Sequence, residues 1–140
     1  MRRYNITAAA LAIGAPRKWT DNILSQHDIP DVLSVRQGVP RRISYPALVR
    51  LTVIRQLHAE LGIGVSDAIR IAARLLDSGQ GAVLAVGQLR LFIDHVALRQ
   101  AVDARLAMAL ESAPSPKRGR PPRKTASARS EHGPRRAADE

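Results

Sequence analysis

The 140-residue sequence contains no cysteine, which excludes disulfide bonds, thiolate metal sites and a cysteine nucleophile. Aromatic residues make up only 3% of the chain, so a core has to be built from Leu, Val, Ile and Ala. The apolar runs are far shorter than a membrane span, and the N-terminus carries no secretory signal pattern. We therefore expect a cytoplasmic protein with no membrane partner.

Residues that carry catalysis show no recognisable arrangement. The four His are dispersed, the acidic residues are scattered, and neither a His-Glu-x-x-His motif nor a phosphate loop with its Lys is present. The sequence predicts neither an enzyme nor a metal or cofactor site.

Acidic side chains are outnumbered, since 12 Asp and Glu stand against 22 Lys and Arg for a net charge of +10. The excess of basic over acidic side chains lies at the two ends of the chain. Residues 1–55 hold nine basic and three acidic side chains, residues 56–111 hold five and six, and residues 112–140 hold eight and three. Two separate basic segments favour two contacts with a polyanion such as double-stranded DNA.

Apolar periodicity and capping residues predict a mainly α protein. A helix is expected over 7–13 with Thr7 as its N-cap, followed by a tight turn at Gly14. A second helix over about 16–25 would hold Pro16 in its first turn, and the pair would form a helix-turn-helix unit. The side chains expected to face inward are Ile13, Trp19, Ile23 and Leu24.

A small hairpin is predicted over residues 32–43. Ser44 then caps a helix that runs to about Leu61, with an apolar stripe at steps of three and four residues. Gly62 ends this helix, and Ser66 is the predicted N-cap of the next one.

The segment "AVLAVGQLRLFI" predicts a second hairpin around Gly87 and Gln88. Asp94 is the predicted cap of a last helix over about 95–111. The Leu, Ala and Val stripe of that helix packs on its own domain or pairs with a second copy, so a homodimer is one expectation. From 112 on, Pro, Ser, Ala and Arg predominate without apolar periodicity, which predicts disorder.

Three stretches resemble the MerR-type winged helix-turn-helix: "YNITAAALAIGAPRKWTDNIL", "SVRQGVPRRISYPALVRL" and "IRQLHAELGIGVSDAIRIA". The resemblance spans about residues 4–76 and implies a DNA-binding domain over 1–78. Residues 79–111 would then add a hairpin and a helix for packing or dimerisation, ahead of the tail, 112–140. The aromatic pair that the family usually has after the turn is replaced here by "RKWTDN". Metal-sensing cysteines and a large effector domain are absent, so sensing is not implied.

A recognition helix needs polar side chains on one face to read the major groove, and a wing needs cations for phosphates. In the second helix Arg17, Lys18 and Asn22, with Asp21, provide such a face. The predicted wing cations are Arg36, Arg41 and Arg42. Arg2 and Arg3 are predicted to form a basic N-terminal arm on the DNA. Taken singly, each of these charges is equally typical of a solvated surface.

Three further side chains have alternative interpretations. Trp19 stacks on a base or, as favoured, lies beneath the recognition helix as part of the core. Tyr45 hydrogen-bonds a phosphate or packs, and these alternatives stay open. His58 lies on an apolar face without a second ligand at suitable spacing, which favours a core histidine over a metal ligand.

The tail segment "KRGRPPRK" resembles an AT-hook, a minor-groove element built on Arg-Gly-Arg-Pro. Arg side chains enter the narrow, negative A·T minor groove, Gly permits close approach of the backbone, and Pro keeps the segment extended. The residues that match or flank the motif are Lys117, Arg118, Gly119, Arg120, Pro121, Arg123 and Lys124. A basic tail that adds only non-specific affinity is the alternative.

The function that these features predict is a sequence-specific DNA-binding transcriptional regulator located on the nucleoid. Two alternatives are an antitoxin-like or adaptor protein whose tail folds onto an acidic protein partner, and a nucleoid-associated architectural protein that prefers A·T without a single operator.

Overall fold

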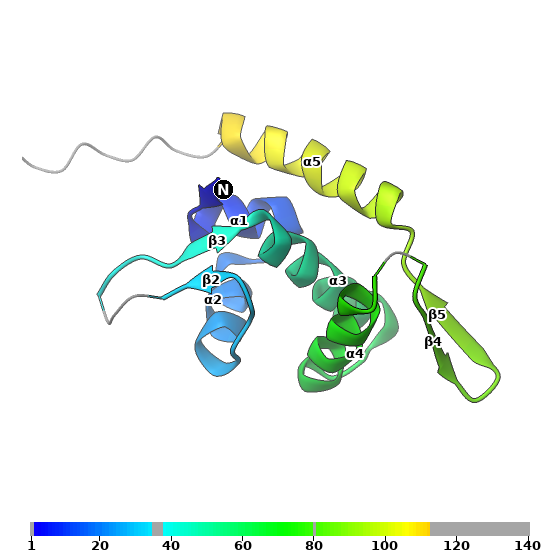
Figure 1. Ribbon diagram of the computed structural model, residues 1–140. Coiled ribbons are helices and arrows are strands. Elements are labelled where there is room, and N and C mark those ends of the chain that lie inside the picture. The colour runs from blue at the N-terminus through cyan, green and yellow to red at the C-terminus, as the bar shows by residue number, and fades with distance from the viewer. Residues whose placement is uncertain (1, 35–37, 80, 113–140) are drawn as a thin grey trace, which may run out of the picture.

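A computed structural model describes residues 2–34, 38–79 and 81–112. Its helices are α1 (Ile6–Ile13), α2 (Arg17–Gln26), α3 (Tyr45–Leu61), α4 (Val65–Asp77) and α5 (His95–Ser112). Its strands are β1 (Arg3–Tyr4), β2 (Val32–Leu33), β3 (Arg42–Ser44), β4 (Val83–Val86) and β5 (Leu89–Phe92). The described chain is thus mainly helical with short antiparallel strands, as expected (Figure 1).

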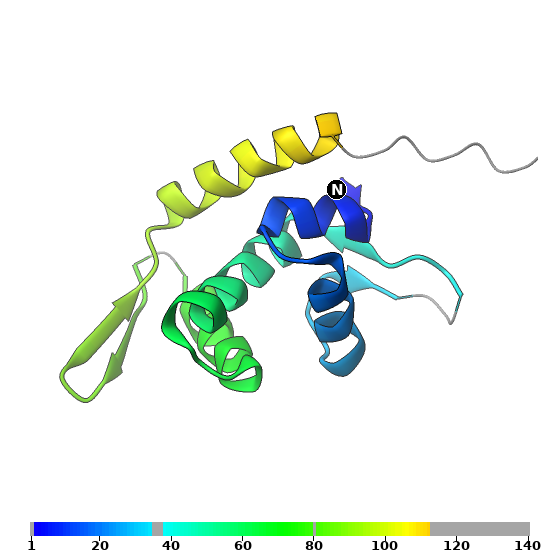
Figure 2. The same ribbon diagram turned by 180° about the vertical axis from the view of Figure 1, so that it is seen from behind.

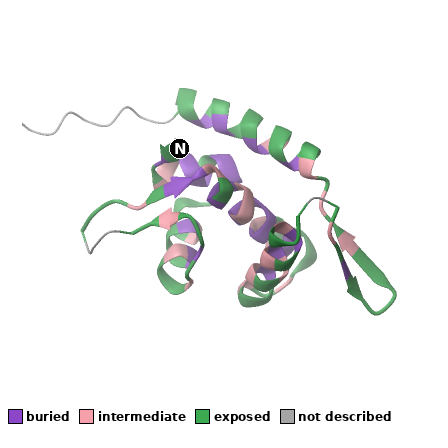
Figure 3. Ribbon diagram, in the orientation of Figure 1, coloured by how far each residue is buried: buried purple, intermediate pink, exposed green. Residues whose placement is uncertain are grey.

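Helix α3 is the centre of the packing, because α1, α4 and α5 all contact it. The largest fully buried apolar side chains come from β3, α3 and α5, and they are Ile43, Leu48, Leu51, Ile54 and Val102. Figure 3 shows the buried residues concentrated along α3 and on the sides of the neighbouring helices that face it. These aliphatic residues build the core with almost no aromatic contribution.

Helix α5 lies across α1 in both views of the molecule (Figures 1 and 2). Its buried side chains Leu98, Val102 and Leu106 belong to the same core cluster as the residues of α1 and α3. The apolar stripe predicted for 95–111 therefore packs on the chain's own helices.

A three-stranded antiparallel sheet with the order β1-β3-β2 joins the N-terminus to the first hairpin. Tyr4 lies opposite Ile43, and both are buried. Strand β1 was not predicted, because two residues are too few to show a period. It fixes the residues before α1 against β3.

The second hairpin was predicted correctly. Val86 lies opposite Leu89 around the two-residue turn Gly87-Gln88, and Gly87 has a positive φ of 59°, which favours glycine. The hairpin projects away from the helices, on the side opposite α2 (Figures 1 and 2).

Several predicted helix ends are confirmed. Gly14 ends α1 in the left-handed conformation with φ 73°, and Gly62 ends α3 in the same way. The Ser44 Oγ accepts a hydrogen bond from the Ala47 N–H at 3.3 Å, and the Asp94 Oδ1 accepts one from the Ala97 N–H at 3.0 Å. Both side chains cap as expected.

Three predicted helix starts are wrong. Asn5 caps α1, because its Oδ1 accepts a hydrogen bond from the Ala8 N–H at 2.8 Å, and Thr7 lies inside the helix. Pro16 is the N-cap of α2 rather than a residue of its first turn. Ser66 lies inside α4, since the chain turns helical directly after Gly64. Asn is a stronger N-cap residue than Thr, but the spacing of the apolar residues did not by itself distinguish Asn5 from Thr7.

Among the described ranges, no helix has the length and apolarity needed to cross a membrane.

Candidate nucleic-acid interface

Helix α2 separates its polar and apolar side chains between two sides. Thr20 and Ile23 are buried against the core, and Trp19 and Leu24 are half-buried. The side chains of the predicted polar face are all exposed, and they are Arg17, Lys18 and Asn22, predicted to contact DNA, with Asp21. Positions 17, 18, 21 and 22 follow the helical spacing of one face. One side of α2 is therefore free for a ligand while the other is anchored.

Trp19 anchors α2 to α3. The Arg55 guanidinium lies 5.0 Å from the centroid of the indole ring, and the His58 ring stacks on the indole at 6.3 Å between centroids. The Nδ1 of His58 lies 2.8 Å from the Ile63 carbonyl oxygen. These contacts support the packing interpretation of Trp19 and His58. In the described part of the chain no cluster of His and acidic residues could hold a metal ion.

The segment 32–44, called the wing below, is tied to α2 through Arg41. The Arg41 Nη1 donates to the Asp21 carboxylate at 2.7 Å, and its Nη2 donates to the Ser25 Oγ at 3.2 Å. Arg41 is half-buried by these contacts. Sequence reasoning assigned Arg41 to phosphates and missed this role, because twenty residues separate the two partners and no local pattern links them.

Wing and helix share a hollow of about 410 Å³, which places the exposed face of α2 beside the wing. The residues that line it are Ile6, Arg17, Asp21, Ser34, Gly38, Val39, Pro40 and Arg41. Arg17 at the start of α2 and the return segment of the wing therefore belong to one surface.

The small sheet places two more predicted contacts on one face. Arg3 lies opposite Ser44, and Leu33 lies opposite Arg42. Because opposed residues share a face and alternate residues repeat it, Arg3 and Arg42 lie on the face away from Ile43. Both are exposed.

Other predicted cations stand apart from this pair. Arg2 is exposed, and its guanidinium lies 5.9 Å from the centroid of the Tyr4 ring. Arg36 lies outside the described residues, and so do the tail residues Lys117, Arg118, Gly119, Arg120, Pro121, Arg123 and Lys124.

The structure divides by role the eight basic residues of 1–55 that it describes. Arg41, Arg50 and Arg55 are half-buried and engaged within the chain. Arg50 pairs with Asp77 of α4 at 2.6 Å and so joins α3 to α4. The exposed ones that remain within the described residues are Arg2, Arg3, Arg17, Lys18 and Arg42. These five are the described N-terminal cations that are exposed to a polyanion.

Tyr45, the first residue of α3, is engaged with α5. Burial, and then the Asp103 carboxylate, raise the pKa of the Tyr45 phenol to about 12. A phenol held by a neighbouring carboxylate supports the packing alternative over a phosphate contact.

Comparisons with models of protein families, with curated proteins and with solved structures found no match to this chain.

Proposed function

We propose that this protein is a sequence-specific DNA-binding transcriptional regulator, with α2 in the major groove and the wing on the adjacent phosphates. The observation that carries the proposal is the two-sided arrangement of α2. Its apolar side is anchored by Trp19 and Ile23, and its polar side is exposed beside the wing. The order β1-α1-α2-β2-β3-α3-α4 supports the MerR-type interpretation of residues 4–76.

The dimensions and chemistry of α2 suit a major groove. Ten helical residues span about 15 Å, and the groove is about 12 Å wide. Arg17 can donate two hydrogen bonds to guanine, and Asn22 can donate to and accept from adenine. Lys18 suits a phosphate as well as a base.

The exposed face of α2 carries one acidic residue, Asp21, whose charge is neutralised by an ion pair. Asp21 would repel phosphates if it were free, but its carboxylate is paired with the Arg41 guanidinium. The pair adds no net charge to the surface. The net positive charge of this face then comes from Arg17 and Lys18, and the sheet adds the exposed Arg3 and Arg42.

The tail would supply a second contact. Its "KRGRPPRK" segment has the residues of an A·T minor-groove element and begins only five residues after the end of α5 at Ser112. A regulator of this kind would bind a major-groove motif flanked by A·T, which would locate it on the nucleoid.

The test is a selection of bound fragments from random genomic DNA, with the full chain and with a chain that ends at Ser112. We expect both to enrich one short motif, and only the full chain to add flanking A·T. Arg17→Ala and Asn22→Ala should each relax the preference at one or two positions of the motif, by about 1–3 kcal/mol per position.

The matched control is Gln100→Ala, which changes an exposed residue of α5 away from α2. It should leave the motif unchanged. Enrichment of A·T without any motif would instead indicate an architectural protein. Failure to enrich any DNA would contradict the proposal and direct the search to acidic protein partners.

A further inference from the structure

The β4-β5 hairpin exposes more apolar surface than a free hairpin tolerates. Val83, Val86, Leu89 and Phe92 are 57%, 52%, 69% and 71% exposed. In this hairpin only Leu84 is buried, and Leu91 is half-buried. A two-stranded hairpin by itself is marginally stable in water. Exposed apolar patches of this kind mark sites of interaction, so we expect a partner to cover these side chains.

The exposed side chains lie on both faces of the hairpin. Val83 lies opposite Phe92, and Val86 lies opposite Leu89. Since side chains alternate along a strand, the first pair occupies one face at the base and the second pair occupies the other face at the tip. A partner that covers only one face would leave half of this surface in water, whereas one that extends the sheet could contact both.

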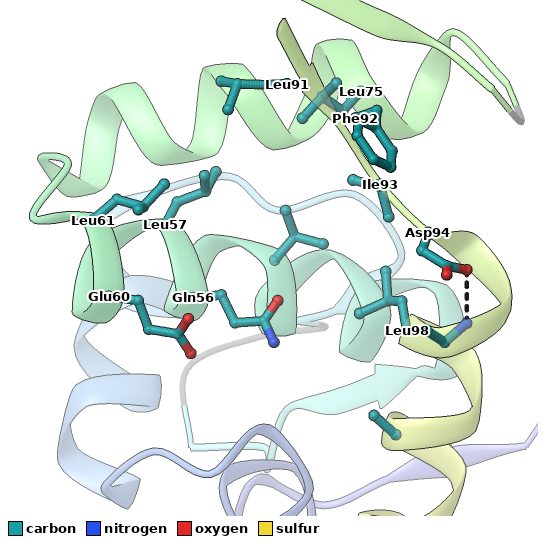
Figure 4. A pocket seen from close by; sticks show the side chains of 13 residues that line it. Gln56, Leu57, Glu60, Leu61, Leu75, Leu91, Phe92, Ile93, Asp94 and Leu98 are labelled. Atoms are coloured by element: carbon teal, nitrogen blue, oxygen red, sulfur yellow. Dashed lines mark hydrogen bonds between the residues drawn. The ribbon is translucent and has the colours of Figure 1, made fainter. Parts of the chain in front are cut away.

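The apolar surface continues from the hairpin onto the helices. A groove of about 500 Å³ runs between β5, α3, α4 and the start of α5. Figure 4 shows Leu91 and Phe92 of the hairpin on the same groove as Leu57 and Leu61 of α3. Leu61, the last residue of α3, is 61% exposed here.

The edge of β4 that β5 leaves unpaired carries neither charge nor proline, and α4 lies against β4 only near its first residues, Val83 and Leu84. Natural edges carry charges, proline or a covering element. Residues 81–89 contain no charged residue and no proline, whereas β5 carries Arg90. Within the described ranges β4 pairs with β5 alone. An uncharged strand edge with unpaired N–H and C=O groups is a template for another strand.

We propose that the β4 edges of two copies of this chain pair antiparallel about a twofold axis, forming a four-stranded sheet in the order β5-β4-β4-β5. The inference is independent of the proposed DNA-binding function. A twofold axis makes the edge self-complementary, so one uncharged strand supplies both sides of the interface. The sheet and the adjoining groove then bury the apolar side chains of both hairpins.

Composition, position and charge favour a second copy over the chain's own tail as the partner of the hairpin. Residues 113–140 contain no Val, Ile, Leu, Met, Phe, Trp or Tyr, so the tail offers no large apolar side chain to the hairpin. The tail also starts at the end of α5 that lies away from the hairpin (Figure 1). Residues 56–111 hold five Arg and six acidic residues, so two copies meet here without the repulsion of the basic ends.

The first test is sedimentation equilibrium of the full chain over a range of concentrations. We expect a monomer–dimer equilibrium that Ala85→Lys weakens by about a hundredfold, because like charges would face each other across the paired edges. Ala85 is exposed in the middle of β4, so the substitution should leave the circular dichroism spectrum and the thermal unfolding of the monomer unchanged. The matched control is Gln88→Lys, which adds the same charge in the turn of the same hairpin.

The second test uses the absence of cysteine, since each introduced Cys is the only thiol in the chain. Ala85→Cys should form a disulfide-linked dimer under mild oxidation. Ala107→Cys, on the exposed side of α5, should not. This pair separates the strand interface from a dimer that forms through α5, where Met108 is also exposed.

Three results would overturn the proposal. They are a monomer at every concentration, a dimer that Ala85→Lys leaves intact and Ala107→Cys crosslinks, and open-ended oligomers in place of a closed dimer. Each can occur while the DNA selection succeeds, so failure here is distinguishable from failure of the proposed function.

Discussion

The Arg41 guanidinium lies 2.7 Å from the Asp21 carboxylate and ties the wing to the helix proposed to read DNA. The pair is partly exposed, with 26% and 54% of the two side chains accessible, so its contribution to stability is at most about 1 kcal/mol. Its larger consequence is electrostatic. It removes one acid and one base from the charge of the candidate interface.

Replacing Asp21 with Asn should therefore strengthen DNA binding. The substitution removes a negative charge and frees Arg41 for a phosphate, so affinity for any duplex should rise several-fold at low salt. The slope of log K against log salt should steepen by about one unit. Fluorescence anisotropy over a salt series measures both quantities.

Asp67→Asn is the matched control, because Asp67 also pairs with an Arg, Arg70, but lies on α4. It should change neither quantity. Equal effects of the two substitutions would mean that only net charge matters and that α2 does not contact DNA.

Gly14 holds the turn between α1 and α2 at φ 73°, where a side chain is strained. Gly14→Ala should lower the free energy of unfolding by about 1–2 kcal/mol, as measured by urea denaturation. Gly64→Ala is the control, since Gly64 has an ordinary φ of −57° and a Cβ added there would meet no atom within 4 Å. A loss as large at Gly64 would show that backbone strain is not the cause.

The raised pKa of Tyr45 predicts a loss of stability in alkali. The folded state holds the phenolic proton more tightly than the unfolded chain, whose pKa is about 10. The contribution of Tyr45 to stability is therefore fully present below about pH 10 and is lost as the pH rises through about 12. Absorbance of the tyrosinate in a Tyr4→Phe background reports the titration of Tyr45 alone.

Asp103→Asn should shift that titration toward 10, because it removes the carboxylate that stabilises the neutral phenol. Glu111→Gln removes an exposed acid from the same helix and should leave the titration in place. A titration near 10 in the parent chain would contradict the engagement of Tyr45 with α5.

The AT-hook interpretation predicts that the preference for flanking A·T depends on which Arg residues of the tail are present, and not only on the total charge of the tail. Replacing both Arg118 and Arg120 with Ala should abolish the preference for flanking A·T. Replacing both Arg135 and Arg136 removes the same charge and should lower affinity for all duplexes alike. Competition between A·T-flanked and G·C-flanked duplexes distinguishes the two. Equal loss of preference in both variants would reduce the tail to a general phosphate contact.

The sequence predicted several helix caps and turns correctly, because these depend on residues only a few positions apart. Ser44 and Asp94 were recognised as caps because each bonds an N–H three residues on. The hairpin turn at Gly87 and the helix end at Gly14 followed from the positive φ that those turns require. Thr7 and Ser66 were misassigned because neighbouring residues competed for the same role.

Contacts between side chains far apart in the sequence could not be predicted. Nothing near Arg41 indicates Asp21, and nothing near Arg55 indicates Trp19, because such pairs depend on how helices and strands meet in space. For the same reason the stripe of α5 could be recognised as apolar without showing which surface would cover it. Only packing showed that Leu98, Val102 and Leu106 face α1 and α3 of their own chain.

The sequence by itself therefore determined the five described helices, the two hairpins and the two-ended distribution of charge, since these depend on neighbours along the chain. The tertiary structure alone decided which of the eight described N-terminal cations remain exposed, and that the β4-β5 hairpin exposes most of its apolar side chains. Burial is a property of the assembled core. Identical side chains at Leu57 and Leu89 end up buried and exposed because Leu57 belongs to the core cluster around α3, whereas Leu89 lies at the tip of the hairpin.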